Sequence, residues 1–251
     1  MKEIDIVSKI RLFLFCIILN LGISNAACGA SVNTSSIKTI SGYPNFYIID
    51  HPLIQQKLTV MRDKKTEAPE FRQMLDEIAM LMGYEITRNL ETIDFKVETP
   101  ITKTIGKKLK EEVIIAPILR AGLVMAGGLH KLIPSANISH IGLYRDPVTK
   151  KPVEYLFKHP KITNQLFIVV DPMLATGNSA VYGVQKLIDA GVLPDRIIFM
   201  ALVAAPEGIK NFSTSHPEVK VYIAALDQKL NDHAYIVPGL GDAGDRLFGT
   251  K

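Results

Sequence analysis

The chain has few of the residues that mark several common protein classes. Among its 251 residues there are only two cysteines, Cys16 and Cys28, and no tryptophan. Because both cysteines lie near the N-terminus, the rest of the chain has no pair for a disulfide and no thiolate set for a metal ion. The six histidines are scattered without metal-ligand spacing. The net charge of +4 is mild and no long basic run occurs, so nucleic acid is not a predicted partner.

The pattern of apolar segments predicts one α/β domain, residues 46–251, after a signal-like extension and polar linker, residues 1–45. Strands are predicted at 46–50, 97–101, 113–117, 138–144, 166–170, 197–204 and 219–225, and helices at 53–61, from 69, and at 121–132, 180–190 and 206–212. This alternation predicts a parallel sheet, whose ligands bind beyond the carboxyl ends of the strands. A period of two over residues 150–161 predicts an arm or hairpin outside the core.

The segment 166–179 is the most informative about chemistry. An apolar run rich in β-branched residues, typical of a buried parallel strand, ends at Asp171. A loop of small residues follows, and a helical pattern begins near Ser179. This order presents backbone N–H groups and the positive end of a helix dipole to an anion. Asp171 adds an acceptor suited to hydroxyl groups or a metal, so the segment predicts a site for a phosphorylated sugar.

Four segments along the chain resemble the motifs of the uracil phosphoribosyltransferases, a family of the type I phosphoribosyltransferase superfamily. They are PILRAG at 117–122, YR at 144–145, DPMLATGNS at 171–179 and YIVPGLGDAGD at 235–245. The resemblance runs from about Phe46 to Lys251. It implies a parallel-sheet α/β fold with a protruding β-arm and a small C-terminal base-binding region. It also implies transfer of the phosphoribosyl group from phosphoribosyl diphosphate (PRPP) to uracil, giving UMP and diphosphate.

The resemblance also assigns site residues. It implies that Arg120 and Arg145 hold the diphosphate and that Asp242 orients uracil or assists with its proton, and we take these three as the catalytic candidates. The PRPP-binding residues implied are Arg120, Arg145, Asp171, Pro172, Met173, Leu174, Ala175, Thr176, Gly177, Asn178, Ser179 and Asp242. The uracil-binding residues implied are Ile236, Gly241, Asp242 and Ala243. Mg²⁺ is expected through PRPP rather than at a protein metal site.

One position departs from the pattern of the family. Asn178 stands where these loops often have a second glycine. Asparagine tolerates left-handed backbone angles better than most residues, so the loop is expected to keep its shape, although a side chain there narrows the phosphate pocket. Other readings remain open: a phosphoribosyltransferase for a purine base or orotate, a non-catalytic nucleotide-sensing protein, and an exported protein with an unrelated surface role. The resemblance implies a homodimer or larger assembly and makes GTP a candidate effector.

The N-terminal extension conflicts with the rest of the chain. Residues 9–28 carry positive charges, a short apolar stretch and small residues, as secretory signal peptides do. The apolar stretch is short for a membrane span, which needs about 20 residues. PRPP, however, is a cytosolic metabolite. We therefore expect a cytoplasmic enzyme, with export or membrane anchoring through residues 9–28 as the alternative.

Overall fold

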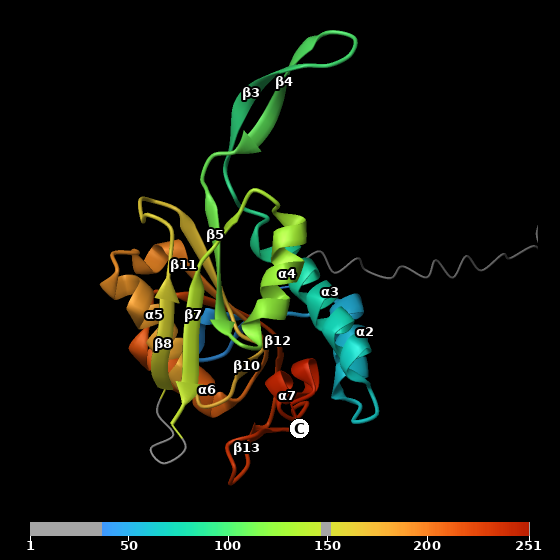
Figure 1. Ribbon diagram of the computed structural model, residues 1–251, viewed down its shortest axis with the longest axis vertical. Coiled ribbons are helices and arrows are strands. Elements are labelled where there is room, and N and C mark those ends of the chain that lie inside the picture. The colour runs from blue at the N-terminus through green and yellow to red at the C-terminus, as the bar shows by residue number, and fades with distance from the viewer. Residues whose placement is uncertain (1–36, 147–151, 251) are drawn as a thin grey trace, which may run out of the picture. The chain divides into compact units, whose positions relative to one another are not determined.

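A central, mostly parallel sheet organises the chain, whose computed structural model describes residues 37–146 and 152–250 (Figure 1). Within these residues the sheet has ten strands. Its parallel strands lie in the order β2 (Tyr43–Ile49), β12 (Lys220–Leu226), β11 (Ile197–Ala204), β9 (Leu166–Val170), β5 (Val113–Leu119) and β7 (His140–Arg145). Antiparallel strands β1 (Ile37–Ile40) and β8 (Pro152–Lys158) close its two edges. The short strands β6 (Asn137–Ile138) and β10 (Met173–Leu174) pair with β5 and β11.

Helices cover both faces of this sheet because the buried strands are apolar on both sides. One face packs against α2 (Pro52–Arg62), α3 (Ala68–Ile86), α4 (Gly122–Leu132) and α7 (Ala243–Phe248). The other face packs against α5 (Asn178–Asp189) and α6 (Pro206–Ser215). Successive residues of one strand alternate between the two cores: Ile168 belongs to the first, whereas Phe167 and Val169 belong to the second. The expected parallel α/β architecture is therefore confirmed.

The helix and strand predictions hold where burial produces a strong pattern. The stripe of Phe71, Leu75, Ile78 and Met82 on α3 is fully buried, as its helical spacing predicts. The predicted strand 197–204 matches β11 at both ends. The 3₁₀ turn η1 (Pro194–Arg196) leads into that strand. A small ribbon of β13 (Lys229–Leu230) and β14 (Ile236–Val237) precedes the C-terminal segment.

A protruding β-arm is present, but the prediction of its position was wrong. The arm is the hairpin of β3 (Thr92–Glu98) and β4 (Lys103–Leu109), which extends away from the sheet where β5 begins (Figure 1). The segment 150–161 instead contributes β8, the edge strand paired with β7. Its period of two in sequence does not follow burial: Phe157 packs against the second core, whereas Tyr155 is 55% exposed and lies at an irregularity in the pairing with β7. Residues 147–151 lie outside the described residues.

Two further predictions need correction. The segment 31–45 was interpreted as linker, yet β1 and the start of β2 lie within it and pair with each other. The strand expected at 97–101 is only the end of β3, because Pro100 and Ile101 lie in the turn of the hairpin. In this turn Thr99 Oγ1 accepts a hydrogen bond from the Thr102 N–H. Residues 37–44 and 97–101 are exposed or half-buried, so burial left only a weak pattern in their sequences.

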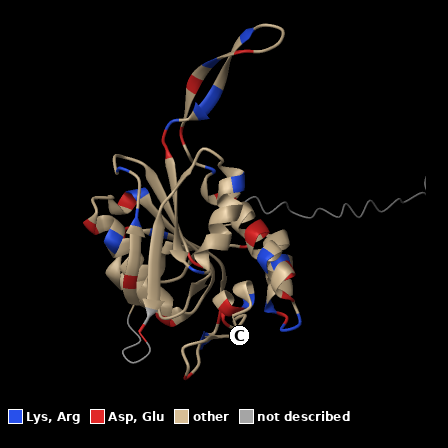
Figure 2. Ribbon diagram, viewed as in Figure 1, with Lys and Arg blue, Asp and Glu red and all other residues tan. Residues whose placement is uncertain are grey.

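Charged residues of both signs lie on the outside of the domain, including the hairpin, where Lys107 pairs with Asp94 (Figure 2). Every described residue belongs to one unit, Ser35–Lys251. Among the helices that the structure describes, none combines the length and the apolar character that a membrane crossing requires.

Candidate active site

A pocket of about 420 Å³ lies at the carboxyl ends of the parallel strands, where ligands of such sheets bind. Its lining comes from distant parts of the sequence: Ile118, Leu119, Arg120, Ala121, Leu143, Tyr144, Asp171, Met173, Ala175, Thr176, Gly177, Asn178, Ser179, Ala180, Ala234, Tyr235, Ile236, Gly241, Asp242, Ala243 and Gly244. The fold thus brings together the three longer motifs that the sequence singled out. The β3–β4 arm lies at the opposite end of the sheet (Figure 1).

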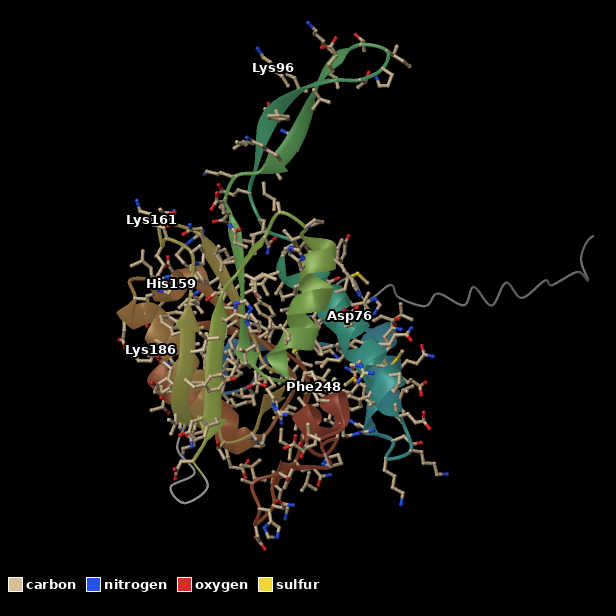
Figure 3. The ribbon with its side chains drawn as sticks, viewed as in Figure 1. Asp76, Lys96, His159, Lys161, Lys186 and Phe248 are labelled. Atoms are coloured by element: carbon tan, nitrogen blue, oxygen red, sulfur yellow. The ribbon has the colours of Figure 1, made fainter. Side chains whose placement is uncertain are left out.

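Arg120 lies where β5 passes into α4. The Leu119–Arg120 peptide is cis. Gly122 opens α4, and a Cβ added there would lie 2.3 Å from the carbonyl oxygen of Val170. Glycine therefore lets α4 start directly against β9, which sets Arg120 beside Asp171 at the pocket. The exposed guanidinium of Arg120 lies 5.7 Å from the ring centroid of Phe248, the α7 residue labelled in Figure 3.

The loop 171–179 has the geometry of an anion site. The Asp171 N–H donates to Met200 at 3.2 Å, which ties the start of the loop to β11. Gly177, with φ of +82°, is the N-cap of α5, and this left-handed angle suits glycine. The first i to i−4 hydrogen bond of α5 is donated by the Val181 N–H to the Gly177 carbonyl, at 2.9 Å. The N–H groups of the first turn thus have no acceptor inside the helix. That of Asn178 reaches Thr176 Oγ1 at 3.5 Å, and a helix start of this kind suits an anion.

Two of the predicted loop residues lie behind the pocket rather than in its lining. Leu174 is fully buried in the second core. The Pro172 carbonyl accepts hydrogen bonds from Leu202 and Val203, both at 3.1 Å. Pro172 and Leu174 therefore attach the loop to β11, while their neighbours Met173 and Ala175 face the cavity. Direct contact of Pro172 and Leu174 with PRPP stays a prediction.

The C-terminal segment completes the pocket with Ile236, Gly241, Asp242 and Ala243, all the residues predicted for uracil. Asp242 Oδ1 accepts the Asp245 N–H at 2.9 Å and so caps α7. An ionised carboxylate has about four acceptor sites, so this side chain can also meet a ligand in the cavity. Arg120 lies close to this segment, with Nη2 3.8 Å from Asp245 Oδ1.

Buried ion contacts hold that segment against the domain. Asp227, which follows β12, accepts the Gly239 N–H at 3.0 Å and pairs with Arg62 at 2.6 Å. Arg246 donates to the carbonyl oxygens of Leu240 at 2.9 Å and Asp63 at 2.7 Å. Burial lowers the pKa of Arg246 from its ordinary value. Sequence reasoning missed Arg62 and Asp227, because no motif links residues so far apart in the chain.

The basic residues of the segment 145–161 are absent from the lining of this pocket or lie outside the described residues. Arg145 ends β7, but its side chain lies outside the described part, as do Lys150 and Lys151. Lys158 pairs with the first residue of β7, at the end of the sheet remote from the pocket. Lys161 lies at that same end (Figure 3).

Carboxylates in the pocket are compatible with a metal ion that arrives with its ligand. Across residues 37–146 and 152–250, no group of three or more His, Cys, Asp or Glu could hold a metal ion. Asp171 and Asp242 do line the cavity. Mg²⁺ commonly binds through one or two carboxylates and substrate phosphates while keeping several waters, so these residues fit such an ion.

The parallel sheet and the strand–loop–helix site at its carboxyl end are those that the sequence resemblance implies for a phosphoribosyltransferase. A model of the family described as uracil phosphoribosyltransferase matches residues 48–250. The uracil phosphoribosyltransferase of Rhodospirillum centenum is 57% identical over 216 residues, covering 86% of this chain and 100% of the relative. That of Macrococcus caseolyticus is 55% identical over 207 residues, covering 82% and 98%. The chain belongs to the uracil phosphoribosyltransferase family.

A protein from Aquifex aeolicus whose structure has been solved has a similar fold. Its structure superposes with a TM-score of 0.78 at 31% sequence identity, and the match covers 82% of this chain and 99% of that one.

Proposed function

We propose that the protein transfers the phosphoribosyl group of PRPP to N1 of uracil, giving UMP and diphosphate. One observation carries the proposal: a single cavity is lined by Arg120, by most residues of the loop 171–179 and by four residues of the C-terminal segment, Ile236, Gly241, Asp242 and Ala243. Each supplies one function that the reaction needs, namely a cation for the diphosphate, an anion site for the 5-phosphate and a backbone edge for the base. Membership of the family supports uracil as that base.

PRPP would lie with its 5-phosphate at the start of α5 and its diphosphate at Arg120. The N–H groups at that helix end, with the Thr176 and Ser179 hydroxyls, would bind the phosphate. Asp171 would accept from the ribose hydroxyls. The guanidinium of Arg120 matches phosphate oxygens with a planar fork of donors. Arg145, at the end of β7, is proposed as the second diphosphate contact.

Transfer requires little covalent chemistry from the protein. The bond from the anomeric carbon to the diphosphate oxygen breaks, a bond to N1 of uracil forms, and the N1 proton is released. Positive charge develops on the ribose and negative charge on the leaving diphosphate, so Arg120 stabilises the departing group more as the bond breaks. The segment 241–243 holds uracil in line, and Asp242 orients it or assists with its N1 proton.

Mg²⁺ is proposed to accompany PRPP. Asp171 and Asp242 are the residues placed to meet it, and the ion would neutralise charge on the diphosphate. The direct test mixes enzyme, PRPP, Mg²⁺ and radiolabelled uracil, with hypoxanthine and orotate in parallel reactions. Labelled UMP is expected, and it should depend on Mg²⁺. Product from another base would indicate a different specificity. PRPP binding without any product, at high enzyme, would indicate a nucleotide-sensing protein and overturn the proposal.

We also propose a homodimer or larger assembly. The β3–β4 hairpin places Ile93, Phe95 and Val97 on one face, exposed by 39%, 49% and 38%, and an apolar face of this kind favours association. Light scattering after size exclusion should show a multiple of 27.7 kDa. Phe95→Asp should lower it, whereas Lys96→Ala, on the opposite face of the hairpin, should not. An unchanged mass for Phe95→Asp would exclude this face.

We also propose that the enzyme is cytoplasmic, because PRPP is made and used in the cytoplasm. A response to GTP is proposed as well. Mass spectrometry of the mature N-terminus, with cell fractionation, tests the location: loss of residues 9–28, or recovery in the membrane fraction, would favour export or anchoring. Adding GTP to the UMP assay tests the effector.

A further inference from the structure

Asn211, on α6, contacts the loop 171–179 through its side-chain amide group. Its Nδ2 donates to the Thr176 carbonyl at 2.9 Å and to Asn178 Oδ1 at 2.9 Å. A primary amide has two N–H donors, so both are used on the loop. Helix α6 lies close behind: a Cβ added at Gly177 would come within 3.0 Å of the Gly208 carbonyl oxygen. The loop is therefore braced from the side opposite the cavity.

The first of these hydrogen bonds fixes the orientation of a backbone amide. In a trans peptide the C=O and the following N–H point in opposite directions. Because the Thr176 carbonyl points toward Asn211, the Gly177 N–H points away from α6. Gly177 lines the cavity, as do Asn178 and Ser179. Asn211 thus turns this amide toward the space assigned to the 5-phosphate.

The second hydrogen bond fixes the side-chain orientation of Asn178, the residue that stands where the family often has glycine. Asn178 is exposed at the cavity, and a side chain that swung inward would occupy space needed by the phosphate and present a carbonyl dipole to it. Holding Asn178 Oδ1 against α6 keeps that side chain at the edge of the loop.

We infer that Asn211 is a positioning residue for the 5-phosphate site, acting through the Thr176 carbonyl and the Asn178 side chain. The inference rests on the proposed donor, PRPP. It concerns only one end of that molecule, because Arg120 belongs to a different segment, between β5 and α4. Loss of Asn211 should therefore weaken binding of ribose 5-phosphate and PRPP, and leave inorganic diphosphate binding unchanged.

A double-substitution cycle measures the coupling. Calorimetric affinities for ribose 5-phosphate, for PRPP with Mg²⁺ and for diphosphate are compared among the unsubstituted enzyme, Asn211→Ala, Asn178→Gly and the double variant. Each hydrogen bond lost is expected to weaken binding about fivefold. Asn211→Ala should thus weaken ribose 5-phosphate binding by about 25-fold in the natural background. With Asn178→Gly the same change should cost about fivefold, because one of the two hydrogen bonds is already absent.

Controls separate positioning from general damage. Thr214→Ala removes a hydrogen bond to Lys210 on the same helix and should not alter ribose 5-phosphate affinity. In turnover assays Asn211→Ala should raise the KM for PRPP and leave the KM for uracil unchanged. If Asn211→Ala does not fold, Asn211→Leu, which keeps the side-chain volume, takes its place in the cycle.

An equal loss in both backgrounds, or an equal loss of diphosphate affinity, would overturn the inference. The cycle needs no turnover, so its result is independent of whether the unsubstituted enzyme makes UMP.

Discussion

Replacing Arg62 by methionine should show how strongly the C-terminal segment depends on one buried ion pair. Arg62 donates to both oxygens of Asp227, at 2.9 and 2.6 Å, and to the Gly239 carbonyl at 2.8 Å. The Asp227 side chain is only 5% exposed and that of Arg62 25%. Methionine keeps the length of the side chain but leaves the Asp227 carboxylate buried without its cation.

The structure sets the expected size of the effect. Removing one partner of a buried pair typically costs 3–5 kcal/mol, so about 3 kcal/mol is expected because Arg62 is partly exposed. Asp227 keeps the Gly239 N–H as a donor, which limits the loss. Adding Asp227→Asn should recover about 1 kcal/mol by removing the unpaired charge. Since Gly239 precedes the segment 241–243, the KM for uracil should rise more than that for PRPP.

Urea unfolding gives the free energy, and initial rates of UMP formation give the two KM values. The control is Lys131→Met, which removes the ion pair with Asp76, the α3 residue labelled in Figure 3. The Lys131 side chain is 65% exposed and that of Asp76 20%, so the loss should be less than about 1 kcal/mol. A loss for Arg62→Met as small as that of the control, or equal changes in both KM values, would refute the reasoning.

Three further outcomes are expected. Gly122→Ala should lower the free energy of unfolding by more than about 2 kcal/mol in urea, because its Cβ would lie 2.3 Å from the Val170 carbonyl oxygen; a stable, active variant would contradict the close contact. Arg120→Ala should lower kcat/KM for PRPP by roughly 10- to 100-fold in the UMP assay without changing the melting temperature, and an unchanged kcat/KM would remove Arg120 from the site. A hydrogen bond from Lys57 lowers the pKa of Glu77 below its ordinary value of 4.5, so this pair stabilises the fold above that pH and its contribution is lost as the pH falls further. Glu77→Gln should therefore lose less stability than the natural protein between neutral pH and pH about 3 in urea titrations; parallel curves would show that Glu77 contributes nothing.

The parts of the fold that could be predicted are those with a strong burial signal. The strand 197–204 and the stripe on α3 have apolar patterns that follow directly from their surroundings. The hairpin β3–β4 is exposed along almost its whole length, yet β3 alternates Ile93, Phe95 and Val97 with charged residues. That period of two is typical of a strand, and the sequence prediction did not use it. The sequence of β8 has a period of two, which an edge strand and a protruding arm share. Only the pairing of β8 with β7 shows that it is an edge strand.

The candidate site was predictable where it is local in sequence. The loop 171–179 carries its own strand, turn and helix start, and Asp242 lies in a recognisable motif. The supports of the site are not local: Asn211 reaches Asn178 across 33 residues of chain, and Asp227 is paired with Arg62 across 165. Each is an ordinary polar residue in its own segment, and only the packing of α6 and β12 gives it a partner.

The alternation of β9 between two cores has a consequence for how this family can vary. Inserting one residue before Ile168 would exchange Ile168 and Val169 between the faces of the sheet and rotate Asp171, at the end of the strand, to the wrong side. Insertions and deletions should therefore occur in loops and in the β3–β4 hairpin, which lie outside the sheet and its helices. The inner strands must keep their lengths, because the residues at their carboxyl ends line the site.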